Sequence, residues 1–283
     1  MKTAYIKYIL SLLLFGTNGI VASYIALTSY EIVFSRTLIG SILLIALFKL
    51  SGGKFTFREH KKDLMYIALS GIAMGTSWMF LFEAYRQIGV GIATLMYYCG
   101  PVIVMILSPL IFKEKLTYAK VTGFGVVIAG LVLVNGDTSG GSTNVWGLFC
   151  GGMSAVTYFF MVVLNKKSEH ITGMENTIIQ LTAGFFTAAV FLLIRQGLVI
   201  DLTGVNLLAV AVLGVVNTGI GCYLYFSSLS GLPVQSVAVL SYLDLLSAVV
   251  FSAVFLSEKM SGVQIIGAVL IIGGAMFGEL KKE

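Results

Sequence analysis

Long runs of apolar residues, separated by short polar connections, dominate the chain from end to end. A helix needs about 20 mostly apolar residues to cross the roughly 30 Å hydrocarbon core of a bilayer. Ten runs approach this length, near Tyr8–Leu27, Ile32–Leu50, Leu64–Tyr85, Ile92–Phe112, Tyr118–Val134, Trp146–Leu164, Thr177–Ile194, Leu207–Leu229, Val234–Leu256 and Ser261–Leu280. Their length and the absence of strict alternation favour helices over strands. The pattern therefore predicts an all-α integral membrane protein with ten transmembrane helices.

The composition agrees with lipid as the main solvent of this chain. Only 11% of the 283 residues are charged, whereas soluble domains carry roughly 25%. The formal net charge of +5 is spread over short clusters between the apolar runs. This arrangement is not the basic face of a nucleic-acid-binding protein, so we expect no nucleic-acid partner.

The basic residues also predict an orientation in the membrane. With the N-terminus inside, 14 of the 18 Lys and Arg residues fall on the cytoplasmic side: Lys2, Lys7, Lys49, Lys54, Arg58, Lys61, Lys62, Lys113, Lys115, Lys120, Lys166, Lys167, Lys281 and Lys282. Only Arg86, Arg195 and Lys259 fall outside, and Arg36 lies within a helix. Such an imbalance predicts a multi-pass protein of the cell membrane with both termini in the cytoplasm.

The chain repeats itself at an offset of 144 residues. The matching positions in the first half are Gly75, Phe82, Val90, Tyr98, Ser108, Glu114, Lys115, Gly123 and Gly130, and those in the second half are Gly219, Phe226, Val234, Tyr242, Ser252, Glu258, Lys259, Gly267 and Gly274. Each half, residues 1–136 and 143–283, holds five predicted helices, so the two halves cross the membrane in opposite senses. Inverted five-helix repeats are typical of secondary transporters with a site near the midplane. Duplication that serves stability alone is the alternative.

Further residues accompany this five-plus-five layout. They are Arg36 in the second predicted helix, Tyr98-Cys-Gly-Pro101 in the fourth, and the segments Glu114-Lys-Leu-Thr117 and Glu258-Lys-Met-Ser261. Together these features resemble the drug/metabolite transporter superfamily, in particular its EamA-domain family, over nearly the whole chain. The resemblance implies a carrier of a small metabolite, such as an amino acid, a vitamin, a nucleotide-like compound or a cationic compound. It also implies a central cavity lined mainly by helices 1, 3, 4, 6, 8 and 9, with helices 5 and 10 peripheral.

Asp244 lies deep in the ninth predicted helix. It follows Val234 by ten residues, which at about 1.5 Å per residue places it roughly 15 Å into the bilayer. A charge at that depth costs about 2.5–3.5 kcal/mol on insertion scales and is functional by default. We expect Asp244 to line the cavity and either to bind a cationic group or to take up a proton. A carboxyl group that only hydrogen-bonds to hydroxyls of a neighbouring helix is the alternative.

Other polar and aromatic side chains fall on the helices that the resemblance places around the cavity. As substrate-binding candidates we take Asn18, Trp78, Tyr97, Tyr98, Tyr158, Asn217, Tyr223 and Tyr242. Aromatic rings can hold apolar or cationic groups, and amides can fix the orientation of a ligand. Packing or anchoring at the membrane interface is the alternative for each of them. Tyr98 and Tyr242 carry more weight because the repeat pairs them.

Two features indicate moving parts. Arg36 and Glu83 both fall in the predicted outer half of the membrane, where they could form a structural ion pair or a gate. Gly100-Pro101 should bend the fourth helix, because proline removes a backbone hydrogen bond. In the second half Leu245 stands where this proline would fall, which leaves open whether the two halves bend alike.

The rival functions are a channel and a membrane enzyme. An enzyme needs converging carboxylates, a His cluster or a nucleophile with a base, and the sequence contains no HExxH, GxSxG or P-loop motif. We therefore expect no enzymatic activity, no metal and no cofactor. A channel usually shows a repeated pore loop or a ring built from several subunits, and neither is evident. Import and export, coupling to protons or facilitative transport, and a monomer or a homodimer all fit the pattern.

Overall fold

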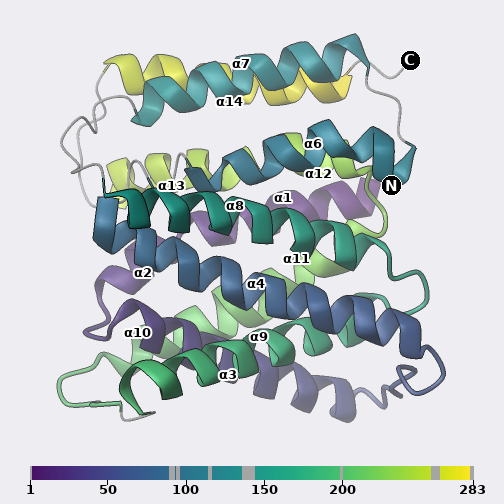
Figure 1. Ribbon diagram of the computed structural model, residues 1–283, viewed down its shortest axis with the longest axis vertical. Helices are drawn as coiled ribbons and strands as arrows, with labels where there is room; N and C mark the ends of the chain where they lie inside the picture. The colour runs from purple at the N-terminus through teal and green to yellow at the C-terminus, as the bar shows by residue number, and fades with distance from the viewer. Residues whose placement is uncertain are drawn as a thin grey trace.

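The computed structural model describes residues 2–88, 93, 96–113, 117–135, 144–197, 200–255 and 262–280. All regular secondary structure in these residues is helical. The helices run roughly parallel or antiparallel to one another and form one bundle (Figure 1). The all-helical architecture expected from the apolar runs is therefore present.

The elements of the first half are α1 (Lys2–Gly16), α2 (Asn18–Ser23), α3 (Ser29–Leu50), α4 (Lys61–Ile88), α6 (Cys99–Phe112) and α7 (Tyr118–Asn135). Those of the second half are α8 (Val145–Lys166), α9 (Gly173–Gln196), α10 (Leu207–Val212), the π-helix η1 (Leu213–Ile220), α11 (Gly221–Leu229), α12 (Val234–Leu240), α13 (Tyr242–Phe255) and α14 (Gly262–Leu280). Six helical segments of the described chain are long and apolar enough to cross a membrane, and shorter apolar helices accompany them. The segments Glu114–Thr117 and Glu258–Ser261, which contribute to the family resemblance, lie mostly outside the described residues.

The first and eighth predicted spans are not uniform α-helices. α1 ends at Gly16, Thr17 forms a turn, and α2 begins at Asn18. The eighth span changes from α10 to the π-helix η1 and then to α11. Hydropathy did not predict either irregularity, because it reports which residues suit lipid and not which backbone hydrogen bonds form. Broken and π-bulged helices often line functional sites in membrane proteins.

The fourth and ninth spans are also interrupted, at nearly equivalent positions. Tyr98 is a turn directly before α6, so Gly100 and Pro101 lie in the first turn of that helix. A proline is tolerated there because the first N–H groups have no partner within the helix. The ninth span breaks at Ser241, one residue before the position that the 144-residue offset pairs with Tyr98. The second half therefore bends without a proline.

α7 and α14 lie next to each other as the outermost pair of helices on one side of the bundle (Figure 1). A Cβ atom on Gly130 would stand 2.6 Å from the carbonyl oxygen of Gly267, and one on Gly274 would stand 2.6 Å from that of Gly123. These four glycines form two pairs at the repeat offset, so the contact is reciprocal. Gly267 and Gly274 of α14 therefore pack against α7.

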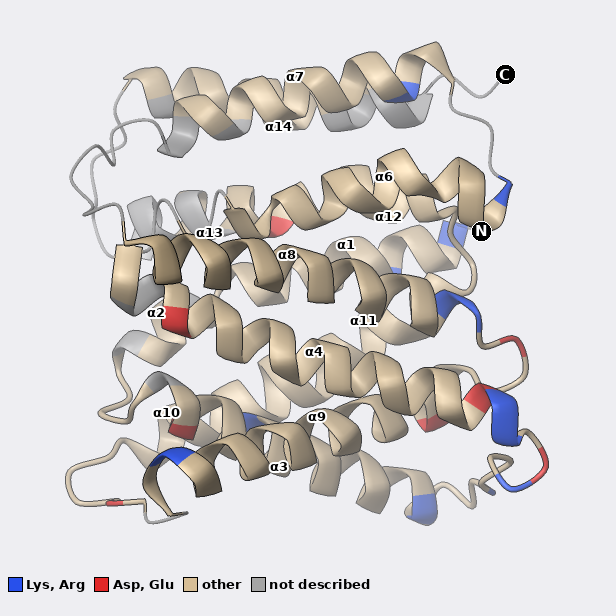
Figure 2. Cartoon of the chain, in the orientation of Figure 1, with Lys and Arg blue, Asp and Glu red and all other residues tan. Residues whose placement is uncertain are grey.

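Basic side chains gather at one end of the helices, here called the basic end (Figure 2). They include Lys2 and Lys7 at the start of α1, Lys49 at the end of α3, Lys61 and Lys62 at the start of α4, and Lys166 at the end of α8. Arg195 lies at the opposite end, in the last turn of α9. The charge asymmetry that the sequence suggested is therefore a property of the folded bundle.

Polar contacts join the two halves at the basic end. The Glu175 carboxylate, in the first turn of α9, accepts hydrogen bonds from the backbone N–H groups of Thr56 (2.8 Å) and Phe57 (2.9 Å). The Asp63 carboxylate accepts one from the backbone N–H of His170 (2.7 Å). The loop between α3 and α4 is thereby fixed to α9, and the start of α4 to the connection between α8 and α9.

The reciprocal glycine contact can be tested by replacing Gly130 with alanine. We expect Gly130→Ala to destabilise the protein by about 1–3 kcal/mol, because the new methyl group must push a backbone carbonyl away. Thermal unfolding in detergent measures this effect. Gly125→Ala on the same helix is the control, since a Cβ there meets nothing within 4 Å. Equal melting temperatures for the two variants would contradict the packing.

Candidate functional site

Asp244 lies in the first turn of α13, next to the break at Ser241. Its Oδ1 atom accepts a hydrogen bond of 2.6 Å from the Tyr98 hydroxyl and one of 2.6 Å from the backbone N–H of Leu245. The Tyr242 hydroxyl in turn donates to the carbonyl oxygen of Tyr98 at 2.7 Å. The two interrupted helices of the fourth and ninth spans are therefore joined by hydrogen bonds at their breaks. The structure brings Asp244 together with Tyr98 and Tyr242, the two tyrosines that the repeat had paired.

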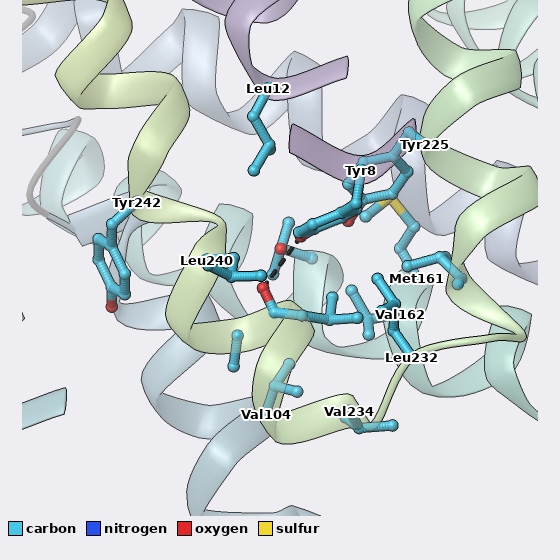
Figure 3. Close-up of a cluster of buried hydrophobic side chains, with 14 of the residues drawn as sticks. Tyr8, Leu12, Val104, Met161, Val162, Tyr225, Leu232, Val234, Leu240 and Tyr242 are labelled. Atoms are coloured by element: carbon cyan, nitrogen blue, oxygen red, sulfur yellow. Dashed lines mark hydrogen bonds between the residues drawn. The ribbon is translucent and has the colours of Figure 1, made fainter. Parts of the chain in front are cut away.

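More tyrosines surround this carboxylate. Tyr97 packs edge-on against Tyr98 and Tyr158, with ring centroids 5.5 Å apart in both pairs. The rings of Tyr8 and Tyr225 pack in a tilted arrangement with centroids 5.2 Å apart, and both belong to the buried cluster drawn in Figure 3. The dashed line there marks the 2.9 Å hydrogen bond from the Tyr8 hydroxyl to the carbonyl oxygen of Val237.

The members of this tyrosine cluster come from α1, α8, α11, α13 and the residues just before α6. They are Tyr8, Tyr97, Tyr98, Tyr158, Tyr225 and Tyr242. Asp244 lies within electrostatic range of Tyr8, Tyr158 and Tyr242. Since Asp244 contacts no Lys or Arg of the described chain, its charge is balanced by neutral hydrogen-bond donors. Such a carboxylate can exchange these donors for a proton or for a cationic group with aromatic faces around it.

Arg36 and Glu83 do not pair with each other. The Arg36 guanidinium donates from Nε to the Thr218 hydroxyl at 2.8 Å and from Nη2 to the Asn18 side-chain oxygen at 3.2 Å. It also lies 5.0 Å from the centroid of the Trp78 ring. The sequence placed Arg36 and Glu83 at similar depth, but it could not show which neighbours their helices have across the bundle.

Glu83 has other partners, near the end of α4 that lies opposite the basic end. It accepts hydrogen bonds from the Tyr30 hydroxyl and the Gln87 amide, and it forms an ion pair of 3.7 Å with Arg195. A cavity of about 290 Å³ opens beside this ion pair and is lined by Thr76, Met79, Phe80, Glu83, Trp146, Cys150, Thr187, Phe191 and Arg195. Of the residues predicted for the site, only Glu83 lines it. A gate made by an Arg36–Glu83 pair is therefore not present.

Asn217 and Tyr223 have other partners than expected. The buried Asn217 amide donates to the carbonyl oxygen of Leu14 at 2.8 Å and to the Thr17 hydroxyl at 2.7 Å, so it spans the break between α1 and α2. Tyr223 on α11 is half-buried, with the Lys7 ammonium 5.4 Å from its ring centroid. Asn217 therefore holds an irregular backbone in place.

The sequence missed Tyr8, Tyr225 and Thr218, which complete the two polar groups around Asp244 and Arg36. In the sequence, Tyr8 was noted only as the first residue of a predicted span. Thr218 and Tyr225 both lie within the apolar run Leu207–Leu229. Each is a hydroxyl at membrane depth that needs a partner, and this is the one property that could have singled them out. In the described residues, no cluster of His, Cys, Asp and Glu could hold a metal ion.

A bundle of apolar helices with broken spans, and with buried charges at the breaks, defines a class of membrane transport proteins. The profile of the EamA-like transporter family matches residues 2–136 and again residues 143–278. The chain belongs to this family, so it is a multi-pass membrane transporter and not an enzyme.

Individual relatives agree with this assignment. An uncharacterized transporter of Bacillus subtilis, YxxF, is 29% identical over 100% of this chain and 91% of its own length. A probable terminal-alkyne amino-acid exporter of Streptantibioticus cattleyicolor is 26% identical over 77% of this chain and 74% of its own. A solved crystal structure superposes with a TM-score of 0.81 at 22% identity, covering 98% of this chain and 97% of that chain. This last likeness concerns the fold alone.

The role of Asn217 can be tested with Asn217→Leu. We expect a loss of stability of about 1–3 kcal/mol, because the two hydrogen bonds that the buried Asn217 amide donates to Leu14 and Thr17 are lost. Thermal unfolding in detergent measures the loss. Asn206→Ser is the control, since Asn206 is exposed and serine also caps a helix start, and it should change stability by less than about 0.5 kcal/mol. An unchanged melting temperature for Asn217→Leu would leave Asn217 free for a role in binding alone.

Proposed function

We propose that this protein is a secondary transporter that moves a small metabolite by alternating access, with Asp244 and the tyrosine cluster as its central site. Ten transmembrane helices form two inverted halves, divided near residues 136 and 143. The site lies where the interrupted fourth and ninth helices meet. The substrate is held there by the Asp244 carboxylate and by the aromatic faces around it.

The observation that carries this proposal is the hydrogen bond between Tyr98 and Asp244. It joins the two halves through one neutral hydroxyl and one carboxylate, at the breaks of both helices. An interaction of this kind can be exchanged for a substrate without leaving a bare charge in hydrocarbon. Rocking of one half against the other then changes the side from which the site is reached.

Proton coupling is the second part of the proposal. Asp244 is the carboxylate of the tyrosine cluster, and a proton would neutralise it in a medium that disfavours charge. A cycle that loads a proton and a substrate alternately on Asp244 would couple their movements. The probable amino-acid exporter among the relatives supports a small amino-acid-like metabolite as one candidate substrate class.

Transport by Asp244→Asn in proteoliposomes tests the central site. The compound to follow is chosen by screening amino acids, nucleosides, vitamins and organic cations for a rise in melting temperature, since a bound ligand stabilises the native state. We expect transport to fall about tenfold or more, as hydrogen bonds to a charged group contribute roughly 1.5–3 kcal/mol. The dependence of the rate on pH should also disappear.

Two companion variants make this test specific. Tyr98→Phe keeps the carboxylate and removes one donor, so it should give an intermediate rate and keep the pH dependence. Asp201→Asn changes an exposed carboxylate in the loop before α10, where a hydrogen bond from Thr203 lowers the pKa of Asp201, and should transport normally. A wild-type rate and pH profile for Asp244→Asn would disprove the proposed site. Ionic conductance far above carrier turnover, without counterflow, would instead favour a channel.

The proposed orientation places the basic end and both termini in the cytoplasm. Single cysteines at Lys54 and Asp201 test this, in a background in which Cys99, Cys150 and Cys222 are all replaced by alanine. A maleimide that cannot cross membranes should label Asp201→Cys in intact cells and Lys54→Cys only after the cells are opened. The reverse pattern would show that the termini face outward.

A further inference from the structure

Arg36 is a buried cation whose partners among the described residues are all neutral. It lies seven residues after the start of α3, roughly 10 Å along the helix, and only 7% of its surface is exposed. Its partners are the neutral side chains of Thr218 and Asn18 and the face of the Trp78 ring. In the described chain no carboxylate contacts it. A guanidinium at this depth is costly and normally faces a counter-charge.

Some N–H donors of the Arg36 guanidinium make no hydrogen bond to the described residues. Arginine has five N–H donors in a planar fork. One Nε and one Nη2 proton are used by Thr218 and Asn18. No oxygen atom of the described residues accepts a hydrogen bond from Nη1. The unused edge of the fork therefore has the geometry that binds the two oxygens of a carboxylate or phosphate.

Both neutral partners of Arg36 belong to irregular backbone. Thr218 lies in the π-helix η1, and its hydroxyl donates to the carbonyl oxygen of Leu213. Asn18 begins α2, directly after the turn at Thr17. Side chains on broken helices can move by changing a few backbone torsions, as the sites of many transporters do. The partners of Arg36 are thus placed where a ligand can replace or rearrange them.

Arg36 lies at about the same depth as Asp244, on another side of α1. Ser247 of α13 donates to the carbonyl oxygen of Leu12, and Asn217 of η1 donates to that of Leu14. These two carbonyls are two residues apart, or about 3 Å along the helix. α1 therefore contacts the elements that carry Asp244 and those that hold Arg36 within one turn of its length.

We propose that Arg36, with Asn18, Thr218 and Trp78, binds an oxyanion of the transported molecule, either a carboxylate or a phosphate. The inference rests on the proposed transport function and narrows its substrates to compounds that carry such a group. The fork of Arg36 holds two oxygens of the anion. The Trp78 ring, already against the guanidinium, offers an apolar face to the carbon atoms next to the charged group.

Anion binding can be measured without transport. Purified protein in detergent is melted in sodium acetate, in sodium phosphate and in sodium chloride, at equal pH and ionic strength. We expect acetate or phosphate to raise the melting temperature by about 2 °C or more above chloride, since ligand binding stabilises the native state. A larger shift in acetate indicates a carboxylate site, and a larger shift in phosphate indicates a phosphate site. The absence of a shift in both arms would overturn the proposal.

Variants show whether the shift comes from Arg36. Arg36→Gln should abolish it, whereas Arg195→Gln, which removes a guanidinium that is 51% exposed, should keep it. Arg36→Lys retains the charge and loses the fork, so it should give less than half of the wild-type shift. This variant keeps the test decisive if Arg36→Gln does not fold. A full shift in either Arg36 variant would show that the anion binds elsewhere.

Uptake separates the failure of this inference from the failure of the proposed function. With the transported compound, Arg36→Lys should raise KM at least fivefold, and the methyl ester of that compound should not be carried. Transport of a neutral compound with an unchanged KM in Arg36→Lys would refute the anion site alone. An Arg36-dependent shift, together with a wild-type rate and pH profile for Asp244→Asn, would refute the proposed central site alone.

Discussion

Hydrocarbon offers no water to a backbone group that loses its helical partner. Each interruption in this bundle must therefore be satisfied from within the protein. The Asn217 amide donates to Leu14 where α1 ends, and the Tyr242 hydroxyl donates to Tyr98 at the start of α6. The Tyr8 hydroxyl donates to Val237 just before the break at Ser241. In all three cases the donor comes from the other half of the chain, so the bent helices and the contact between the halves stabilise each other.

Depth in the membrane could be predicted from the sequence, and lateral position could not. Hydropathy found the spans because apolar runs report the thickness of the bilayer. The repeat offset then paired Tyr98 with Tyr242, two residues before Asp244, and the structure brings these three residues together. Arg36 and Glu83 also share a depth, but the order of helices around the bundle gives them different neighbours. That order depends on side-chain packing between helices, for which hydropathy carries no information.

The half-buried carboxylate of Asp244 and the buried guanidinium of Arg36 do not pair with each other. Asp244 is held by a tyrosine hydroxyl and a backbone N–H, and Arg36 by a threonine, an amide and an indole ring. A direct ion pair in a medium of low dielectric constant would be difficult to open, because separating it exposes both charges at once. Neutral partners provide weaker and separable contacts. Each charge therefore remains available to a molecule that brings its own countercharge.

The reciprocal glycines of α7 and α14 are the contact that two identical five-helix chains would make around a two-fold axis. In such a pair, every residue near the axis would occur twice. Position 244 corresponds to position 100 at the repeat offset, and a symmetric pair could hold two aspartates there or two glycines. When both halves belong to one polypeptide, the two equivalent positions can differ, so the site can hold one aspartate. Among the described residues, the tyrosine cluster holds one carboxylate, that of Asp244, and the equivalent Gly100 packs directly against Tyr158.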